Sequence, residues 1–445
     1  MIAAAISLAL LALPRWTYEV TASGSDLAVQ ARFPPGSGEE FTIEGTEDFV
    51  GDVQVAGRAV ARTGDRWNAP ACERGCTLTY RFALGAAAAA DDPDVAARFG
   101  RVIESPPASW LLHPRAGARG TSIQFRVISA PGESFAVGLP PGDEPGTYVL
   151  EADALPSSPY AAFGPMETTD VHLGTRSLRI AIVPSRREFA GGELLQWISQ
   201  QAHSVAAYFG RLPVDHTLLL VLPVEGRGVH GRTMGGGGAT VLFWLGTRAT
   251  RATLQRDWVL VHELVHTALP SLNRYAHRWA EEGLATYVEP IVRARAGLVS
   301  DTQFWRDLVE GLPQGLPRAG DRGLDATPTW GRTYWGGALF WLLADVQIRE
   351  RTRGARSLDD ALRGVLLKSG GIGARWPLAR VLREGDAAVG TPVLEELHAR
   401  MGAAAAPVDL DSLFRRLGVS TSVGETRFDD RAPLARVRAA ITAAP

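Results

Sequence analysis

Two segments of the sequence decide the fold: VHELVH at residues 261–266 and WAEEG at residues 279–283. We predict a helix for each. His262 and His266 are four residues apart, so they lie on one helical face, about 6 Å from each other. Their imidazoles can then converge on one tetrahedral zinc ion. Glu263, one position after the first histidine, projects beside them and can hold a water molecule at the metal.

A hydrolytic zinc keeps three protein ligands and an open position, so the second segment is expected to supply one more ligand. Glu282 is the candidate, because the glycine that follows it, Gly283, lets two helices approach closely at the metal. Glu281 is the competing candidate. Neighbouring residues on a helix point about 100° apart, so only one of the two can serve. The cofactor that this pattern predicts is Zn²⁺.

Other polar residues near these segments can be assigned either a role at the metal site or a purely structural one. Glu289 follows Glu282 by seven residues, on the same helical face, and can accept a hydrogen bond from a zinc-binding imidazole. The alternative is an exposed glutamate before Pro290. We expect His277 and His230 to be surface or structural residues rather than substrate contacts.

The two segments, together with residues 334–362 (YWGGALFWLLADVQIRERTRGARSLDDAL), resemble the glycyl aminopeptidase family of gluzincin zinc metallopeptidases. That family is related to the alanyl aminopeptidase and leukotriene hydrolase group. The likeness covers about residues 177–367. It implies a multidomain α+β protein with a thermolysin-like catalytic domain, a zinc cofactor and a peptide substrate.

The resemblance also implies a role for each site residue. His262, His266 and Glu282 hold the zinc. Glu263 is the general base for zinc-activated water and then passes the proton to the leaving nitrogen. Tyr334 matches the tyrosine that precedes the family's Gly-Ala helix, and it is the predicted donor to the oxyanion; the alternative is an aromatic ring packed at a helix start.

One departure from the family concerns the amino end of the substrate. The related exopeptidases carry a glycine-rich strand motif whose glutamate binds the free amine, whereas MGGGGAT at residues 234–240 contains no acid. Gly235, Gly236, Gly237 and Gly238 can still lie beside an extended peptide, because glycine permits close backbone approach. An aminopeptidase is therefore the leading hypothesis. The alternatives are an endopeptidase of the same fold and a degenerate peptidase-fold binding protein.

The chain divides by pattern into three folded regions. Short β-branched and aromatic segments between Gly and Pro clusters predict an amino-terminal β-sandwich, and the later pattern is mixed and then mostly helical. The predicted domains are residues 15–165, the β-rich domain; 170–330, the catalytic domain; and 331–445, the helical domain. The predicted elements of the catalytic domain are strands at 177–183, 217–222 and 239–245 and helices at 192–209 and 255–269.

The composition of the chain limits the classes of binding partner and the cellular compartment that we expect for it. With 46 basic against 48 acidic residues in 445, the chain lacks the basic excess of proteins that bind nucleic acid or anionic membranes. Residues 1–14 predict a signal peptide, since the apolar run has the length of one and is too short to span a bilayer; the alternatives are an uncleaved anchor and a misassigned start. We therefore expect a periplasmic or extracellular protein, in which Cys72 and Cys76 can close a tight disulfide. The oligomeric state is not predicted.

Overall fold

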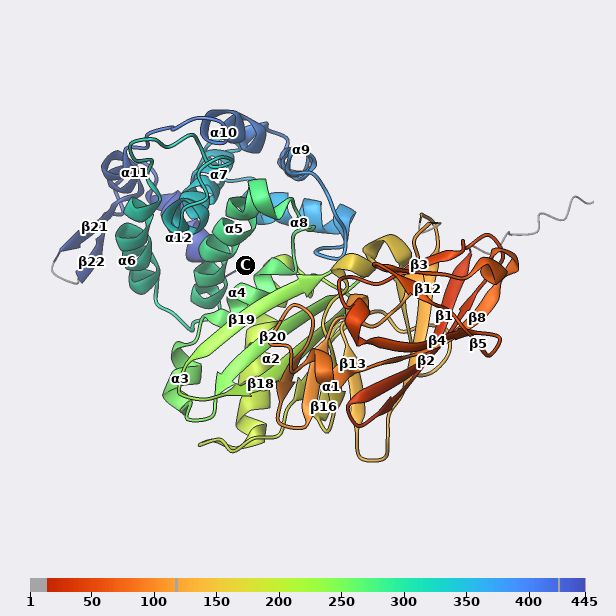
Figure 1. The fold of residues 1–445 in the computed structure, drawn as a ribbon. Coiled ribbons are helices and arrows are strands. Elements are labelled where there is room, and N and C mark those ends of the chain that lie inside the picture. Colours follow the sequence, from red (N-terminus) through yellow and green to blue (C-terminus); the bar gives the residue numbers. More distant parts are fainter. Residues whose placement is uncertain (1–13, 117–118, 423–424, 445) are drawn as a thin grey trace, which may run out of the picture. The chain divides into compact units, whose positions relative to one another are not determined.

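The computed structural model describes residues 14–116, 119–422 and 425–444 (Figure 1). The predicted signal peptide lies outside the described residues, except for its last position. The chain divides into two compact units, Met1–Met166 and Glu167–Pro445. Among the described residues, no helix is both long enough and apolar enough to cross a membrane.

The amino-terminal unit is built from strands in three sheets. The seven-stranded sheet has the order β14-β12-β1-β2-β8-β4-β5, and two four-stranded sheets have the orders β13-β15-β10-β9 and β11-β3-β7-β6. The strands are β1 (Arg15–Ser23), β2 (Asp26–Phe33), β3 (Glu40–Thr42), β4 (Val50–Val55), β5 (Arg58–Ala59), β6 (Arg62–Thr63), β7 (Arg66–Asn68), β8 (Cys76–Phe82), β9 (Ala97–Phe99), β10 (Val102–Ser105), β11 (His113–Pro114), β12 (Ser122–Ile128), β13 (Ser134–Val137), β14 (Thr147–Glu151) and β15 (Ala161–Gly164).

Alternating side chains explain why this unit is built mainly from strands. In β1 the residues Trp16, Tyr18 and Val20 are buried while their neighbours face outward, which is the period of two that a half-buried strand requires. Strands predominate in this unit, as they do in the predicted β-rich domain. The strands form three sheets, however, where a simple sandwich has two.

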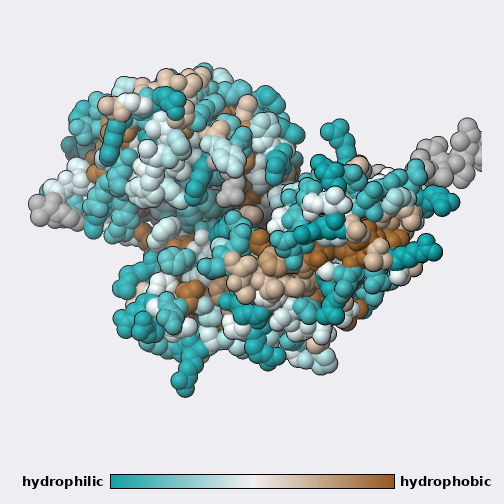
Figure 2. All heavy atoms as spheres, viewed as in Figure 1, coloured by the Kyte–Doolittle hydropathy of each residue, from teal (hydrophilic) through white to brown (hydrophobic). Residues whose placement is uncertain are grey.

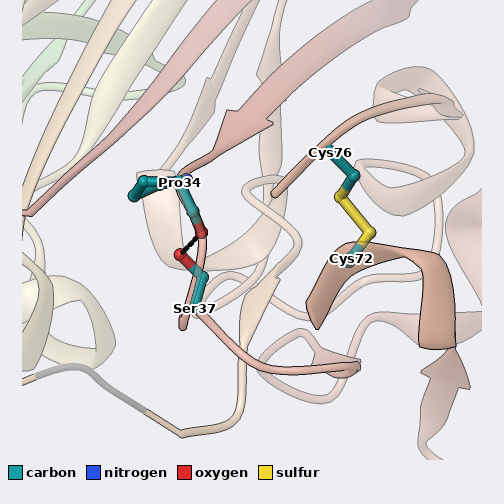
Figure 3. Close-up of a disulfide and its surroundings, with 4 residues drawn as sticks. All are labelled: Pro34, Ser37, Cys72 and Cys76. Carbon is teal, nitrogen blue, oxygen red and sulfur yellow. Dashed lines mark hydrogen bonds between the residues drawn. A yellow bond between two sulfur atoms is a disulfide. The ribbon is translucent and has the colours of Figure 1, made fainter. Parts of the chain in front are cut away.

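The two cysteines are bonded to each other in this unit (Figure 3). Cys72 lies in the short helix η2 (Pro70–Arg74) and Cys76 begins β8. Gly75 between them has φ +86°, a left-handed conformation that glycine adopts without strain. Both thiols are thus committed to a local structural link, and neither is available as a metal ligand.

A single five-stranded sheet lies in the second unit, with the order β16-β17-β18-β20-β19. Its strands are β16 (Glu167–Leu173), β17 (Arg176–Ile182), β18 (His216–Val224), β19 (Val229–Gly235) and β20 (Ala239–Gly246). β17, β18 and β20 run parallel, and the two edge strands are antiparallel to their neighbours. The apolar run of β18 is buried on both faces, as expected in the interior of a parallel sheet.

The second unit is otherwise mostly helical, and most of its helices gather on one side of the sheet (Figure 1). They are α2 (Gly191–Phe209), α3 (Arg251–Arg256), α4 (Val259–His266), α5 (Arg274–Arg295), α6 (Asp301–Gly311), α7 (Gly337–Arg351), α8 (Leu358–Ser369), α9 (Leu378–Val389), α10 (Val393–Met401), α11 (Leu410–Leu417) and α12 (Ala435–Thr442). A small hairpin, β21 (Val419–Ser422) and β22 (Glu425–Phe428), precedes α12.

The predicted single helix at residues 255–269 is wrong, because the structure has two helices there. α3 ends at Arg256 and α4 begins at Val259. Asp257 lies at the break, and its Oδ2 accepts a hydrogen bond from the backbone N–H of Leu260 at 3.1 Å. A carboxylate at this position caps a new helix start, which periodicity alone does not reveal.

Two glycines allow α5 and α7 to pack in direct backbone contact. A Cβ atom added to Gly283 would lie 2.3 Å from the Cα of Gly337, closer than any side chain tolerates. Through this contact the residues predicted as separate domains, 170–330 and 331–445, share one hydrophobic core within one compact unit.

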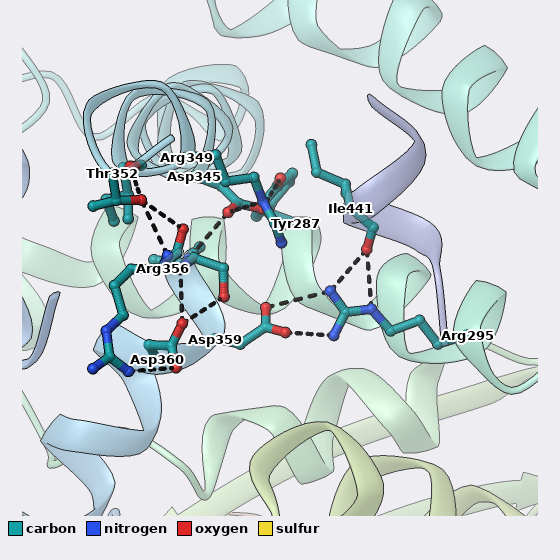
Figure 4. A network of polar contacts seen from close by, with 12 residues as sticks. Tyr287, Arg295, Asp345, Arg349, Thr352, Arg356, Asp359, Asp360 and Ile441 are labelled. Atoms are coloured by element: carbon teal, nitrogen blue, oxygen red, sulfur yellow. Dashed lines mark hydrogen bonds and ion pairs between the residues drawn. The ribbon is translucent and has the colours of Figure 1, made fainter. Parts of the chain in front are cut away.

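A buried network of charges holds the far end of α5 against α7 and α8 (Figure 4). Asp345 accepts hydrogen bonds from Arg349 Nε at 2.8 Å and from the Tyr287 hydroxyl at 3.1 Å. Arg295 donates to Asp359 in a paired contact between helices. Because these charges are buried and paired, breaking one partner is expensive, and the network fixes the helix that carries Glu282.

Hydrophilic residues cover most of the helical region on the face drawn in Figure 2. Five large hydrophobic side chains stay exposed among the described residues: Ile128, Trp258, Tyr275, Trp330 and Leu367. Two of these, Trp258 and Trp330, lie beside the residues that the sequence singled out.

Candidate metal centre

Three predicted ligands converge on one point between α4 and α5. Nε2 of His262 lies 3.4 Å from Oε2 of Glu282, and Nε2 of His266 lies 3.5 Å from the same oxygen. The three donor atoms all lie within 4.8 Å of one another. The helical spacing puts both imidazoles on one face of α4, and α5 brings the carboxylate to them.

The donor set fits zinc. A tetrahedral zinc about 2.0–2.1 Å from each nitrogen or oxygen ligand places neighbouring ligand atoms roughly 3.3 Å apart. The two nitrogen–oxygen separations measured here, 3.4 and 3.5 Å, are close to that value. Two imidazoles and one carboxylate also leave a fourth position open, as in catalytic rather than structural sites.

Glu281, the competing candidate, is turned away from this point. Its Oε1 accepts a hydrogen bond from the backbone N–H of Leu272 at 2.9 Å, in the loop before α5. The structure thus resolves the choice between the adjacent carboxylates by geometry. Gly283 does allow a close helix approach, but to α7 at Gly337 rather than to the helix that carries the histidines.

The three groups attract one another strongly. Burial lowers the pKa of His266, but the hydrogen bond and charge of Glu282 outweigh it and raise that pKa to about 9. For Glu282, burial raises the pKa, while the two histidines hold it far below its usual range. A proton and a metal cation compete for the same position between them.

Glu263 lies against the edge strand β19. The Thr233 hydroxyl is 2.7 Å from Oε2 of Glu263 and 2.9 Å from its main-chain oxygen. A Cβ atom on Gly231 would lie 2.3 Å from Cγ of Glu263, so only glycine lets the strand come this close. Neither Thr233 nor Gly231 was found from the sequence. Val229, Gly231 and Thr233 share one face of the strand, but glycine is depleted in strands, so this series does not predict the element.

Tyr334 is also part of the site. It lies in a π-helical turn, η6 (Arg332–Gly336), that leads into α7. Nη2 of Arg278 lies 3.4 Å from the Tyr334 hydroxyl, and Nε of Arg278 donates to Oε1 of Glu282 at 3.3 Å. Burial and the nearby Glu282 carboxylate raise the pKa of Tyr334 above its usual value. Trp330 packs on its ring at 5.8 Å between centroids.

The predicted glycine loop forms the end of β19 and the turn into β20. A Cβ on Gly235 would lie 2.5 Å from the Ile372 side chain, and the N–H of Gly237 donates to the carbonyl of Gly373 at 3.3 Å. Gly236 N–H donates within the turn, to the carbonyl of Gly238 at 3.3 Å. The segment between α8 and α9 therefore covers this end of the strand.

Glu289 does not make the contact predicted from its helical position. Its Oε1 accepts a hydrogen bond from Arg293 at 2.9 Å, and none of the described histidines donates to it. The carboxylate is buried between helices, not exposed before Pro290. His277 lies at a kink of α5 and faces Asp325, and His230 is exposed on β19.

Comparison with known proteins finds solved structures with a similar fold. No family model and no curated protein matches the sequence. The aminopeptidase N family protein from Idiomarina loihiensis superposes with a TM-score of 0.67 at 13% identity, over 91% of this chain and 78% of that one. The M1 zinc metallopeptidase from Deinococcus radiodurans superposes with a TM-score of 0.54 at 16% identity, over 89% of this chain and 96% of that one.

A mutant of an M1 zinc metallopeptidase from Deinococcus radiodurans, bound to a Tyr-Ser-Ala substrate, superposes with a TM-score of 0.55 at 17% identity, over 89% of this chain and 95% of that one. The structural neighbours are thus aminopeptidase N-like M1 zinc metallopeptidases. This likeness supports a zinc peptidase fold for the chain.

Proposed function

We propose that this protein is a zinc-dependent peptidase that removes residues from the amino end of short peptides. The observation that carries the proposal is the convergence of His262, His266 and Glu282, with Glu263 beside them on α4. The M1 fold of the structural neighbours supports it. The glycyl aminopeptidase branch remains a prediction from the sequence.

The chemistry is hydrolysis of a peptide bond. Zinc held by the three ligands would supply a Lewis acid that polarises the peptide carbonyl and makes a water molecule more acidic. Glu263 accepts the proton of the attacking water as the oxygen–carbon bond forms. It then delivers that proton to the leaving nitrogen as the carbon–nitrogen bond breaks.

Thr233 keeps the general base in place through both proton states. Its hydroxyl has one proton and two acceptors within reach, Oε2 and the main-chain oxygen of Glu263. When Glu263 is ionised, the hydroxyl donates to Oε2. When Glu263 has taken the proton, its carboxyl donates to Thr233 and the hydroxyl turns to the main-chain oxygen. The carboxyl is therefore oriented before and after proton transfer.

Tyr334 is the donor for the negative charge that develops on the peptide carbonyl oxygen. Its hydroxyl lies on the α7 side of the ligands, next to Glu282, and Arg278 contacts both groups. A donor placed in advance at this position stabilises the transition state more than the ground state.

The edge strand β19 offers a backbone for an extended peptide. Peptides commonly bind to proteins by adding a strand to an exposed sheet edge. One face of β19 carries Gly231 and Thr233 against Glu263, and two residues further on Gly235 meets Ile372. Because Ile372 would stop a peptide a short distance to one side of the reacting bond, the arrangement favours an exopeptidase over an endopeptidase.

The proposed location is outside the cytoplasm. The apolar amino-terminal run and the Cys72–Cys76 disulfide support it, since disulfides persist in oxidising compartments. Fusion of residues 1–20 to a reporter that is active only after export tests this point directly. Reporter activity is expected, and a reporter retained in the cytoplasm would contradict it.

The function is tested by loading the purified chain with zinc and digesting peptides in two matched forms, with a free amine and with an acetylated amine. We expect stoichiometric zinc and release of amino-terminal residues from the free form alone. Equal cleavage of both forms would identify an endopeptidase. A chain that binds no zinc would leave only a peptidase-fold binding protein.

A further inference from the structure

A cavity of about 410 Å³ opens at the start of β19, outside the metal centre. Arg227, Gly228 and Val229 form one wall, and Arg256, Trp258 and Val259 form another. We call this cavity the arginine pocket.

The arginine pocket and the candidate metal centre lie one after the other along both β19 and α4. Val259 lines it, and the same side chain would be 2.8 Å from a Cβ placed on Gly231. Glu263 follows Val259 by one helical turn, about 6 Å along α4. Gly231 follows Val229 by two residues, about 7 Å along the strand. Trp258 also contacts the His262 ring, at 5.4 Å between centroids.

The charge in the pocket is positive and available. Arg227 and Arg256 are both exposed, and no described carboxylate forms an ion pair with either guanidinium. Asp257 also lines the pocket, but it is buried and its Oδ2 accepts the N–H of Leu260 at the start of α4. Two unpaired guanidinium groups in a concave site are suited to a carboxylate.

We propose that the arginine pocket binds the terminal carboxylate of the peptide substrate, two or three residues beyond the bond that is cleaved. This inference rests on the proposed peptidase function and names its substrate class: short peptides with a free carboxyl end. An extended peptide advances about 3.3 Å per residue, so two residues cover the distance from Gly231 to Val229, where the pocket begins.

The pocket also sets the direction of the peptide. Along one face of β19 the positions in order are Val229 at the arginine pocket, Gly231 and Thr233 at Glu263, and Gly235 under Ile372. The positive end attracts the carboxylate, so the amino end lies toward the covered glycine turn. This orientation is the one that an aminopeptidase needs, and it arises without an acid in the glycine turn.

The test compares alanine peptides of two to five residues, each as the free acid and as the carboxyl-terminal amide. With the zinc-loaded protein, we expect KM to be on the order of tenfold lower for the free acid at three or four residues, with kcat alike. The difference in KM between free acid and amide should become smaller at five residues, because the carboxylate of that peptide extends beyond the pocket. Equal KM values for acid and amide at every length would overturn the proposal without any variant.

Variants assign the preference to the two arginines. The double variant Arg227→Ala, Arg256→Ala should raise KM for the free acid to that of the amide. Arg251→Ala is the matched control, because this residue of the same α3 pairs with Glu193 and does not line the pocket. An acid preference that survives the double variant would contradict the assignment.

A binding measurement separates this proposal from the proposed function. Calorimetry on Glu263→Gln measures peptide affinity without turnover, so it reads the pocket even if the protein is not a peptidase. Tighter binding of trialanine than of its amide, lost in the Arg227, Arg256 double variant, is expected. Equal affinity for the two forms would refute the carboxylate subsite, whether or not the native chain cleaves peptides.

Discussion

The Thr233 hydroxyl lies 2.7 Å from Oε2 of Glu263 and joins the edge strand to the proposed general base. We predict that Thr233→Val lowers kcat about tenfold, the equivalent of one lost hydrogen bond to a charged group, with little change in KM. Thr233→Ser should restore most of the rate because it keeps the hydroxyl. Steady-state kinetics of the three forms measure this. A serine variant as slow as the valine variant would show that the methyl group and not the hydroxyl matters.

Substitution of the two adjacent glutamates of α5 should have different effects on zinc binding. Glu282→Gln removes the charge of the proposed ligand and should abolish stoichiometric zinc, whereas Glu281→Gln keeps an oxygen that can accept from the Leu272 N–H and should retain zinc. Metal analysis after dialysis against a small excess of zinc measures both. Loss of zinc in Glu281→Gln with retention in Glu282→Gln would reverse the assignment.

The glycine contact between α5 and α7 should tolerate no side chain. Gly283→Ala forces a methyl group to within 2.3 Å of Gly337 and is expected to cost about 1–3 kcal/mol in unfolding free energy. Gly192→Ala in α2 is the control, because a Cβ there meets no atom within 4 Å. Thermal unfolding should show a lower Tm for the first variant only. Equal Tm values for the two would mean that the helices do not pack this closely.

Glu289 should make stability depend on pH. Burial raises its pKa to about 7, with Asp257 and Asp307 adding to the shift and Arg293 opposing it. The folded chain thus holds this proton more tightly than the unfolded chain. The contribution of Glu289 to the free energy of unfolding is therefore fully present below about pH 4.5, and roughly 3 kcal/mol of it is lost as pH rises to about 7.

Unfolding of the metal-free protein at pH 4.5 and pH 8 measures this effect. In Glu289→Gln the loss between the two pH values should shrink, because the amide does not ionise. An unchanged pH dependence would mean that another group causes the loss of stability. Asp257 is one such group, because burial raises its pKa to about 6. Zinc content should be unaffected by the variant, since Glu289 contacts Arg293 and not a ligand imidazole.

The convergence of the three candidate ligands was predictable because its geometry is local. His262 and His266 share a helical face by spacing alone, and Glu282 needed only to be on the next helix. The predicted role of Glu289 failed because the 3.6-residue period fixes a face of α5 but not what packs against it. Arg293, four residues further on, takes the carboxylate instead.

The strand side of the site could not be read from the sequence. Thr233 reaches Glu263 only because β19 pairs with β20 and lies over α4, and these are long-range contacts. Glycines at 231 and 235 are needed for close approach, yet they lower strand propensity and hide the element. The break at Asp257 was missed for a similar reason, since a helix cap acts through one hydrogen bond, not through periodicity.

The most direct test of the central claim is the rate of amino-acid release from a short free-amine peptide, measured on the zinc-loaded protein and on Glu263→Gln at equal zinc content. We predict release by the native chain and a loss of at least about 100-fold in the variant, as expected when a general base is removed. Release by the variant at a rate close to that of the native chain would contradict the account.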